Sequence, residues 1–258
     1  MRIAVLLKQV PDIVEELEIA ADGRDLVRDD LRYRLNEFDD YALEEALQLK
    51  SAAGTEVVAL ALDGDDVDQI LYTAMAKGVD RAIKVSGGGE PRSARAGALM
   101  LAEALRPLAP DLVLTGVQAP DDLEGQLAPL VGAALGLPHA NVVNGVTLDA
   151  GARTVKITQE FSGGLVAHLE GQLPVVLGIQ ASCEPPRYAP VTRVRQAMSS
   201  GKLESVSVAA PARAPALALR RLAKPEATGH AEMVGGSVED LADRLVAVLR
   251  ERGFGAKS

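Results

Sequence analysis

Apolar and polar positions alternate along the first half of the chain in blocks that predict strands and helices in turn. Short apolar runs of strand type occupy residues 2–8, 55–62, 81–85 and 111–115. Helical apolar spacing is found in the segments between and after them, at 38–52, 66–77, 93–108 and 123–135. This alternation predicts an α/β protein with a Rossmann-like, mostly parallel sheet and helices on both faces.

The segment 36–47, NEFDDYALEEAL, gives the clearest helical pattern. Asn36 suits an N-cap, and Gly54 ends the helix. Apolar residues share one face of this helix, and Glu44 and Glu45 are predicted to turn away from it.

The pattern changes at two places later in the chain. Antiparallel strands are predicted at 142–148, 154–161 and 165–170, and a buried strand at 174–181. A hairpin with its turn at 21–24 precedes Asn36. We expect an adenine-nucleotide-binding-like α/β domain over 1–205 and, over 206–258, an extended arm followed by a helix at 238–252. The apolar stripe of that helix needs a cover from this domain or from another subunit, and it consists of Leu241, Leu245, Val248 and Leu249.

Composition limits the classes of function. The formal net charge of −9 argues against a nucleic-acid binder. No apolar run approaches the roughly 20 residues of a membrane span, and the N-terminus lacks the cleavage pattern of a signal peptide, so we expect a cytoplasmic protein. The chain has one cysteine, Cys183, which excludes an internal disulfide and by itself suggests a small buried hydrophobe. With three histidines, no metal site is expected. Aromatic residues make up only 3%, so a bound flavin would depend partly on another chain.

The segment 111–138 carries the strongest sign of a ligand site. A buried strand runs into a polar turn, in which Gly116 allows an unusual backbone angle, and then into a helix. Such turns bind nucleotides at the carboxyl edge of open α/β sheets, although many are only connections. The stretch 86–89, SGGG, is expected to be a flexible loop, since it follows the third strand and lacks the Asp-Ser of adenylating enzymes. No nucleophile and base have a recognisable spacing, so we assign no catalytic residue.

Four segments in order resemble the electron-transfer flavoprotein beta subunit: 5–12 (VLLKQVPD), 36–47, 116–138 and 184–198 (EPPRYAPVTRVRQAM). The resemblance implies a cytoplasmic or mitochondrial-matrix heterodimer whose alpha subunit holds the redox-active FAD. Electrons would come from dehydrogenases and pass to an acceptor such as a quinone oxidoreductase. The chain would be an electron-carrier subunit and no enzyme by itself, and residues 206–258 would pack on the alpha subunit.

The resemblance also implies a nucleotide site in the beta subunit, for AMP or, in bifurcating relatives, a second FAD. The corresponding residues are Leu6, Asn36, Asp39, Leu62, Gly116, Gln118, Asp121, Asp122, Gly125, Gln126 and Leu127. Two departures predict weak or altered binding. Leu127 offers no hydroxyl at the phosphate turn, and the acidic loop 63–66 would repel a phosphate by about 1 kcal/mol per solvated carboxylate. The carboxylates of this loop are more typical of a solvated helix start than of a cation site.

Residues 183–188 correspond to the loop that grips partner dehydrogenases in this family, normally through a leucine. Cys183 stands at the position of that leucine, and Pro186, Arg187 and Tyr188 complete the candidate surface. A rigid exit from the preceding strand is the alternative. The rival function is a stand-alone adenine-nucleotide-binding module of the universal-stress-protein kind, which needs neither 36–47 nor 184–198. An adenylating enzyme ranks third.

Overall fold

The computed structural model describes residues 1–29, 31–53, 55–87, 93–122, 124–209, 211, 219–225 and 233–255. Gly54, Gly88, Gly89, Leu123, His230 and part of the expected arm (210, 212–218 and 226–232) lie outside these ranges. The chain divides into two compact units, Met1–Leu222 and Ala223–Ser258, which are described separately.

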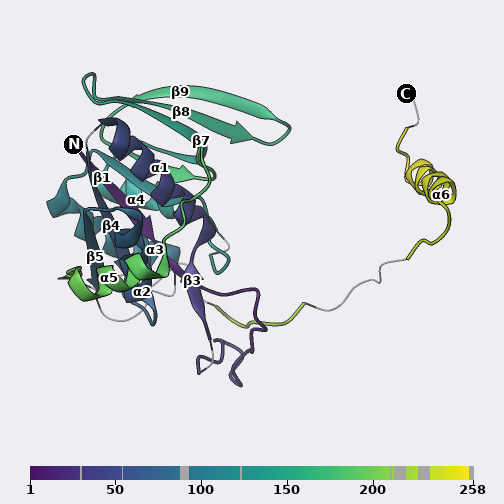
Figure 1. The fold of residues 1–258 in the computed structure, drawn as a ribbon, viewed down its shortest axis with the longest axis horizontal. Helices are drawn as coiled ribbons and strands as arrows, with labels where there is room; N and C mark the ends of the chain where they lie inside the picture. The colour runs from purple at the N-terminus through teal and green to yellow at the C-terminus, as the bar shows by residue number, and fades with distance from the viewer. Residues whose placement is uncertain are drawn as a thin grey trace. The chain divides into compact units, whose positions relative to one another are not determined.

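Within the described residues of the first unit, nine strands form one sheet in the order β11-β5-β4-β1-β6-β10-β7-β8-β9 (Figure 1). Every pairing from β11 to β7 is parallel, and β8 and β9 extend the sheet antiparallel. The predicted α/β class with an antiparallel extension is confirmed. The strands are β1 (Arg2–Leu7), β4 (Glu56–Leu62), β5 (Arg81–Ser86), β6 (Leu112–Gly116), β7 (His139–Asp149), β8 (Thr154–Phe161), β9 (Leu165–Gln172), β10 (Val175–Ile179) and β11 (Glu204–Ser207).

Helices cover both faces of the parallel sheet. On one face α1 (Glu37–Ala53) packs against β1 and β6 and α2 (Val67–Lys77) against β4 and β5, and the core there includes alternate residues of β1 such as Val5. On the other face α3 (Ala94–Leu105) packs against β4 and β5 and α4 (Leu127–Leu135) against β6 and β10, and the core there includes the intervening residue Leu6. Because consecutive strand residues point to opposite faces, β1 contributes to both core layers, and each large side chain it buries stabilises the fold by about 1.5–3 kcal/mol.

Two helix boundaries differ from the prediction. Ser93 caps α3 by accepting a hydrogen bond from the Ala96 N–H at 3.2 Å, but the α-helix ends at Leu105 and continues only as a 3₁₀ turn, Arg106–Leu108. The helix expected from residue 123 begins at Leu127, because the residues before it form the turn that follows β6.

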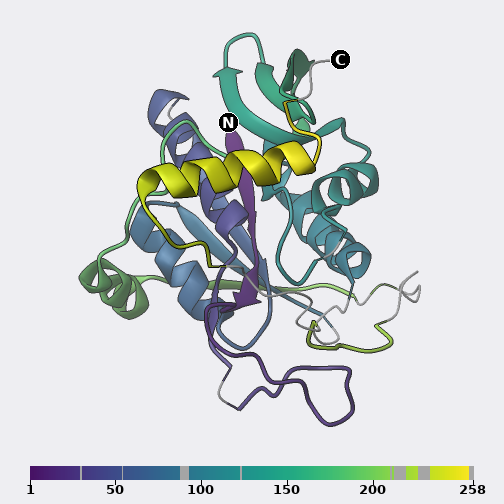
Figure 2. The same ribbon diagram turned by 90° about the vertical axis from the view of Figure 1, so that its right-hand side faces the viewer.

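The predicted hairpin before α1 is present. Strand β2 (Gln9–Pro11) pairs antiparallel with β3 (Tyr33–Leu35), and Ile19 bridges Leu26 across the turn. Gly23 occupies the turn with a φ of +66°, a conformation that favours glycine. In both ribbon views the connection between β2 and β3 projects beyond the arrowhead of β1 (Figure 2).

Two elements were not predicted. Helix α5 (Val191–Ser200) packs against α2 and buries only Val194. Strand β11 adds a parallel strand to the outer edge of β5, so Val206 and Ser207, at the start of the expected arm, belong to the sheet.

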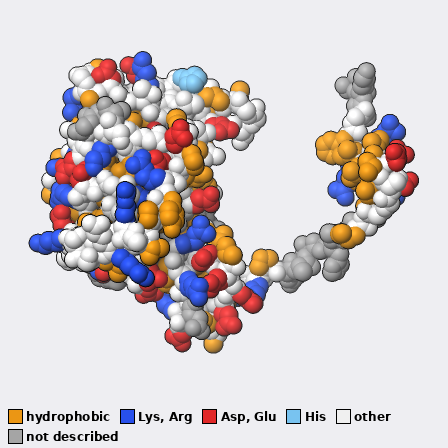
Figure 3. Space-filling view, in the orientation of Figure 1, with side chains coloured by type: hydrophobic (Ala, Val, Ile, Leu, Met, Phe, Trp, Pro, Cys, Tyr) orange, Lys and Arg blue, Asp and Glu red, His pale blue; other side chains and the backbone are white. Residues whose placement is uncertain are grey.

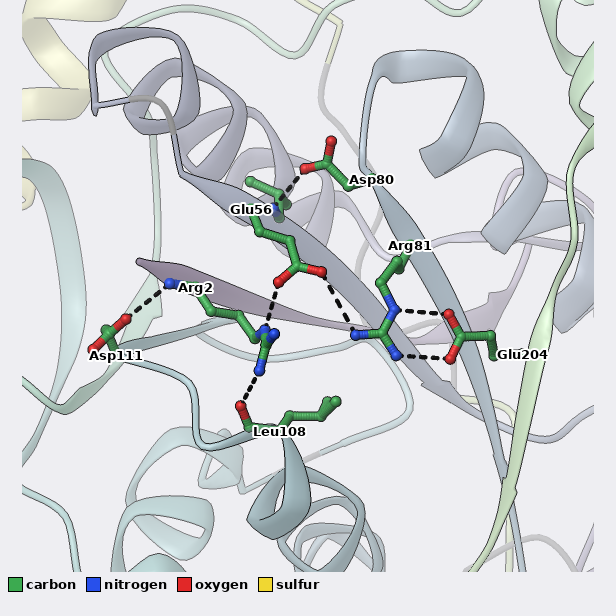
Figure 4. A network of polar contacts seen from close by, with 8 residues as sticks. Arg2, Glu56, Asp80, Arg81, Leu108, Asp111 and Glu204 are labelled. Atoms are coloured by element: carbon green, nitrogen blue, oxygen red, sulfur yellow. Dashed lines mark hydrogen bonds and ion pairs between the residues drawn. The ribbon is translucent and has the colours of Figure 1, made fainter.

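A ladder of ion pairs ties β11 to the central strands (Figure 4). The Arg2 guanidinium contacts Glu56 at 2.7 Å, and Glu56 contacts Arg81 at 3.6 Å. Arg81 in turn forms two hydrogen bonds of 2.7 Å to Glu204 of β11. The ladder therefore crosses β1, β4, β5 and β11 in one row.

The second unit contains α6 (Val238–Glu251), at the position predicted for the final helix. Ser237 and Asp240 form a capping box at its start. Hydrophobic side chains gather on one side of α6 and charged ones on the other (Figure 3), and Leu245, Val248 and Leu249 are exposed. None of the helices in the described ranges is long and apolar enough to cross a membrane.

Candidate functional site

The sheet has a topological switch point between β1 and β6. From the central strand β1 the chain moves through α1 to β4 and β5 on one side, and it later returns to place β6 on the other side. Open α/β sheets bind ligands at the carboxyl ends of strands at such a point. The predicted site residues Leu6, Leu62 and Gly116 lie at or next to the ends of β1, β4 and β6. The side chain of Leu6 is buried in the core, so a ligand would meet only its backbone.

Asp39, from the first turn of α1, bonds both strands at the switch point. Its Oδ2 accepts the Lys8 N–H, just after β1, and its Oδ1 accepts the Gly116 N–H at the end of β6, each at 2.8 Å. The residue is only 2% exposed. Burial raises the pKa of the Asp39 carboxyl to about 7, although hydrogen bonds from Asn36, Gly116 and Lys8 oppose the shift.

Gly116 lies where the start of α1 leaves no room for a side chain. The prediction of an unusual backbone angle at Gly116 is wrong, because this residue is not among the positive-φ residues of the described chain. A Cβ at this position would lie 2.3 Å from Asp39 Oδ1 and 2.8 Å from the Asp39 backbone N. The glycine lets the start of α1 approach the end of β6.

Asn36 holds the N-cap position, but its side chain does not cap the helix. The Asn36 carbonyl accepts the Asp40 N–H at 3.0 Å, while the side-chain Nδ2 donates to the Gln118 carbonyl at 2.9 Å. Asn36 is 2% exposed, and its Oδ1 is buried with no partner within the described residues. A buried acceptor without a donor is what a ribose hydroxyl or an adenine amino group would satisfy, so Asn36 fits a nucleotide ligand.

The turn between β6 and α4 is closed by local bonds. Asp122 donates its N–H to the Ala119 carbonyl at 3.0 Å and accepts the Glu124 N–H on Oδ1 at 3.1 Å. Gly125 has a φ of +57° and lies against Gln118. Gln126 precedes α4 without a side-chain cap bond, and Leu127 is the first helical residue.

The acidic loop after β4 is paired with cations. Asp65 accepts from the Tyr33 hydroxyl at 2.9 Å and from the Arg28 guanidinium at 3.3 Å. Lys84 contacts Asp68 at 2.8 Å and Asp63 at 3.9 Å. Across the turn, Lys8 pairs with Asp121 at 2.7 Å. These pairs offset part of the negative charge that was expected to repel a phosphate.

Farther along α1, two carboxylates bind the candidate docking loop. Glu44 and Glu45 are 4% and 2% exposed, so the prediction that they turn away from the buried face is wrong. The Glu44 carboxylate accepts the Arg187 N–H at 3.0 Å, Nε at 2.8 Å and Nη2 at 2.7 Å. Burial alone raises the pKa of Glu44, but the hydrogen bonds from Arg187 outweigh it and lower the pKa below its usual value.

Glu45 lies beside backbone groups instead of charged side chains. The backbone of Val146 and that of Cys183 face its carboxyl, and Oε2 is buried without a hydrogen-bond partner in the described chain. Burial dominates and raises the pKa of Glu45 to about 7.

The loop presents a mixed surface. Cys183 is exposed, so it is not the small buried hydrophobe that its type suggested. Tyr188 is 79% exposed, and Pro186 is half-buried. Arg187, also predicted to contact a partner, bonds Glu44, and its side chain remains 41% exposed.

Comparison with known proteins decides the family. Residues 25–212 match the model of the electron transfer flavoprotein domain. The electron transfer flavoprotein subunit beta of Methylophilus methylotrophus is 34% identical over 262 residues, which cover 97% of this chain and 98% of the relative. The Syntrophomonas wolfei subunit of the same name is 34% identical over 83% of this chain and 81% of its own length. The human one is 29% identical over 98% of both.

The chain belongs to the electron-transfer flavoprotein beta-subunit family. The predicted resemblance is thereby confirmed, and with it the α/β fold.

Sequence reasoning about this beta-subunit chain missed the bonds that organise the site. Lys8, Glu44 and Glu45 were assigned no role, although they join segments that had been recognised individually. Their signal was the position of both glutamates inside the motif 36–47, beside apolar residues. Within the described part of the chain, no three His, Cys, Asp or Glu side chains gather as metal ligands would.

Proposed function

We propose that the chain is the beta subunit of a heterodimeric electron-transfer flavoprotein, which passes electrons from dehydrogenases to an acceptor such as a quinone oxidoreductase. The match to relatives named as beta subunits over nearly the full length of both chains carries this proposal. An alpha subunit holds the FAD in this account. The scarcity of aromatic rings supports that assignment, because few side chains here could stack on a flavin.

FAD and this chain would contribute different parts of the function. FAD, when bound to the heterodimer, supplies the redox chemistry. In our proposal this chain contributes binding surfaces: the edge of the sheet at the ends of β1 and β6, the loop 183–188, and residues 206–258 against the alpha subunit. The exposed apolar side of α6 supports the last assignment, because an amphipathic helix buries that side in a stable assembly.

We propose that the edge of the sheet at the ends of β1 and β6 binds AMP or the adenylate half of a second FAD weakly. Asn36 Oδ1 would accept a hydrogen bond from the ligand, and the uncapped start of α4 at Gln126 favours a phosphate. The carboxylate of Asp39 is already bonded to Lys8 and Gly116, so it positions the two strand ends. Titration of the heterodimer with AMP in a calorimeter tests this. Stoichiometric AMP or second FAD that survives purification at micromolar protein would contradict weak binding.

For partner recognition we propose Cys183, Pro186 and Tyr188 as the contacting residues. Tyr188 is the largest exposed side chain of the loop, and aromatic anchors often dominate interfaces. Replacement of Tyr188 by alanine should raise the KM of the partner dehydrogenase for the heterodimer about tenfold.

The function is tested by coupling the purified heterodimer to candidate dehydrogenases. Reduction of the bound flavin by a dehydrogenase and its substrate, followed by reoxidation by a quinone oxidoreductase, would support the proposal. A colourless homodimer that binds adenine nucleotides would instead support the stand-alone nucleotide-binding module.

A further inference from the structure

We propose that Glu44 is a positioning residue for partner recognition, which fixes the loop 183–188 on α1 through Arg187. The inference rests on the proposed role of this loop in docking. In this proposal Arg187 of the PRY segment anchors the loop to α1, and the neighbouring side chains contact the partner.

The loop is anchored to α1 at its second end. There Glu44 receives three N–H groups of Arg187, one from the backbone and two from the guanidinium. At its first end the Cys183 backbone lies beside Glu45, the next residue of the helix. Only residues 184–186 lie between these two contacts.

The Glu44–Arg187 pair differs from a surface salt bridge. The Glu44 side chain is 5% exposed and that of Arg187 is 41% exposed, so the carboxylate is dry while the guanidinium closes over it. Two parallel N–H···O bonds fix the plane of the guanidinium as well as its distance. Lysine cannot reproduce this geometry, because its ammonium group is a point charge without a planar fork.

The bonds from Arg187 to Glu44 orient the side chain beside it. Tyr188, the next residue, is largely solvent-exposed, and Cys183 is exposed at the start of the loop. The three N–H bonds of Arg187 therefore set the direction in which Tyr188 faces. A loop without these bonds would present the same residues in many arrangements, and ordering them on binding would weaken association.

The same helix also carries Asp39, at the switch point of the sheet. Glu44 lies five positions after Asp39, which is a rise of about 7.5 Å along the axis of α1. One helix thus contacts both the switch point and the loop. Strand β10, which precedes the loop, is fixed in the same sheet by its pairing with β6 and β7.

The test compares Glu44→Gln and Arg187→Lys in the heterodimer with its alpha subunit. Each variant should raise the KM of the partner dehydrogenase for the flavoprotein about ten- to hundredfold and leave kcat unchanged, because the flavin site is untouched. The Arg187→Lys variant keeps the positive charge. A higher KM in this variant would therefore show that the geometry of the guanidinium matters, and not only its charge. Glu103→Gln on α3 is the matched control, since it removes a carboxylate that pairs with Arg106 at 3.0 Å on the surface and should leave KM unchanged.

Labelling of the single cysteine gives a second readout that does not need electron transfer. The rate at which Cys183 reacts with a thiol reagent should rise severalfold in Glu44→Gln, because the loop gains mobility. The double variant Glu44→Gln with Arg187→Gln should show the same labelling rate as Glu44→Gln alone. This is expected when two residues act through one contact.

Unchanged KM and unchanged Cys183 labelling in Glu44→Gln, with an active wild-type complex, would overturn the inference. If Glu44→Gln does not fold, Arg187→Lys decides by the same two readouts. A wild-type complex that accepts electrons from no dehydrogenase would instead refute the proposed function, and the labelling experiment would still decide whether Glu44 orders the loop.

Discussion

At the scale of single residues, the first half of α1 uses buried carboxylates to bond the chain around it. Asp39 joins two strand ends, and Glu44 holds a guanidinium. Glu45 is buried beside the Val146 and Cys183 backbone, and burial raises its pKa to about 7. Buried acidic groups are tolerated when hydrogen bonds replace their hydration or when they stay protonated. The proposed nucleotide site and the proposed docking loop therefore both contact α1.

Gly116→Ala tests the close approach of α1 to β6. The added Cβ meets backbone as well as Asp39 Oδ1, so it cannot be accommodated by rotation of one side chain. We expect a loss of about 1–3 kcal/mol in the free energy of unfolding, measured with urea. Gly171→Ala on β9 is the control, because the nearest atom there is Val155 Cγ1 at 3.9 Å. Equal stability of the two variants would contradict this account of Gly116.

Glu45→Gln tests the buried carboxyl through pH. The folded chain keeps the Glu45 proton to about pH 7, whereas the usual value of 4.5 applies once the chain unfolds. Between these values the unfolded state binds fewer protons, so rising pH lowers the stability of the wild type. The full effect is at most about 3 kcal/mol. The advantage of the wild type over Glu45→Gln should therefore shrink between pH 4.5 and pH 8. An advantage that grows with pH would show that Glu45 is ionised when folded.

At the scale of elements, the ion-pair ladder fastens the edge strand β11. The side chains of Arg81 and Glu204 are 32% and 38% exposed, so Glu204→Gln should lower global stability by less than about 1 kcal/mol. Its local effect should be larger, with faster hydrogen exchange of the Val206 and Val208 amides. Glu170→Gln, in an exposed pair with Lys156 at 3.7 Å, should leave this exchange unchanged. Unchanged exchange at β11 in Glu204→Gln would mean that backbone pairing alone holds the strand.

The elements differ in how far their sequence predicted them. Strands such as β4 were predicted because both faces are buried and the apolar run is continuous. Helix α5 escaped prediction because it buries only Val194, which leaves no stripe. Strand β11 escaped because Glu204–Ser207 is short and only its pairing with β5 makes it a strand.

The contacts within the candidate site were also not predictable from the sequence. The motif residues indicate the candidate nucleotide site and the candidate docking loop, whose functions stay predictions, but hydrophobic periodicity assigns every glutamate to solvent. Glu44 is bound by Arg187, 143 residues later in the chain, and Glu45 lies beside Val146 and Cys183. Periodicity carries no information about such contacts.

At the scale of the whole molecule, the apolar side of α6 gives a test of assembly. We propose that it packs on the alpha subunit, so Leu245→Asp should weaken association of the two subunits at least about tenfold. Asp243→Asn, on the same helix, should leave it unchanged. Analytical ultracentrifugation of the mixed subunits measures both. Equal association of the two variants would show that α6 lies outside the subunit contact.

The central claim is that this chain completes an electron-transfer flavoprotein, and co-purification with the alpha subunit tests it most directly. The chain is co-expressed with that subunit, the complex is isolated, and the nucleotides released on denaturation are quantified. The account predicts a one-to-one complex that contains one FAD and less than stoichiometric AMP. No complex and no flavin would contradict it.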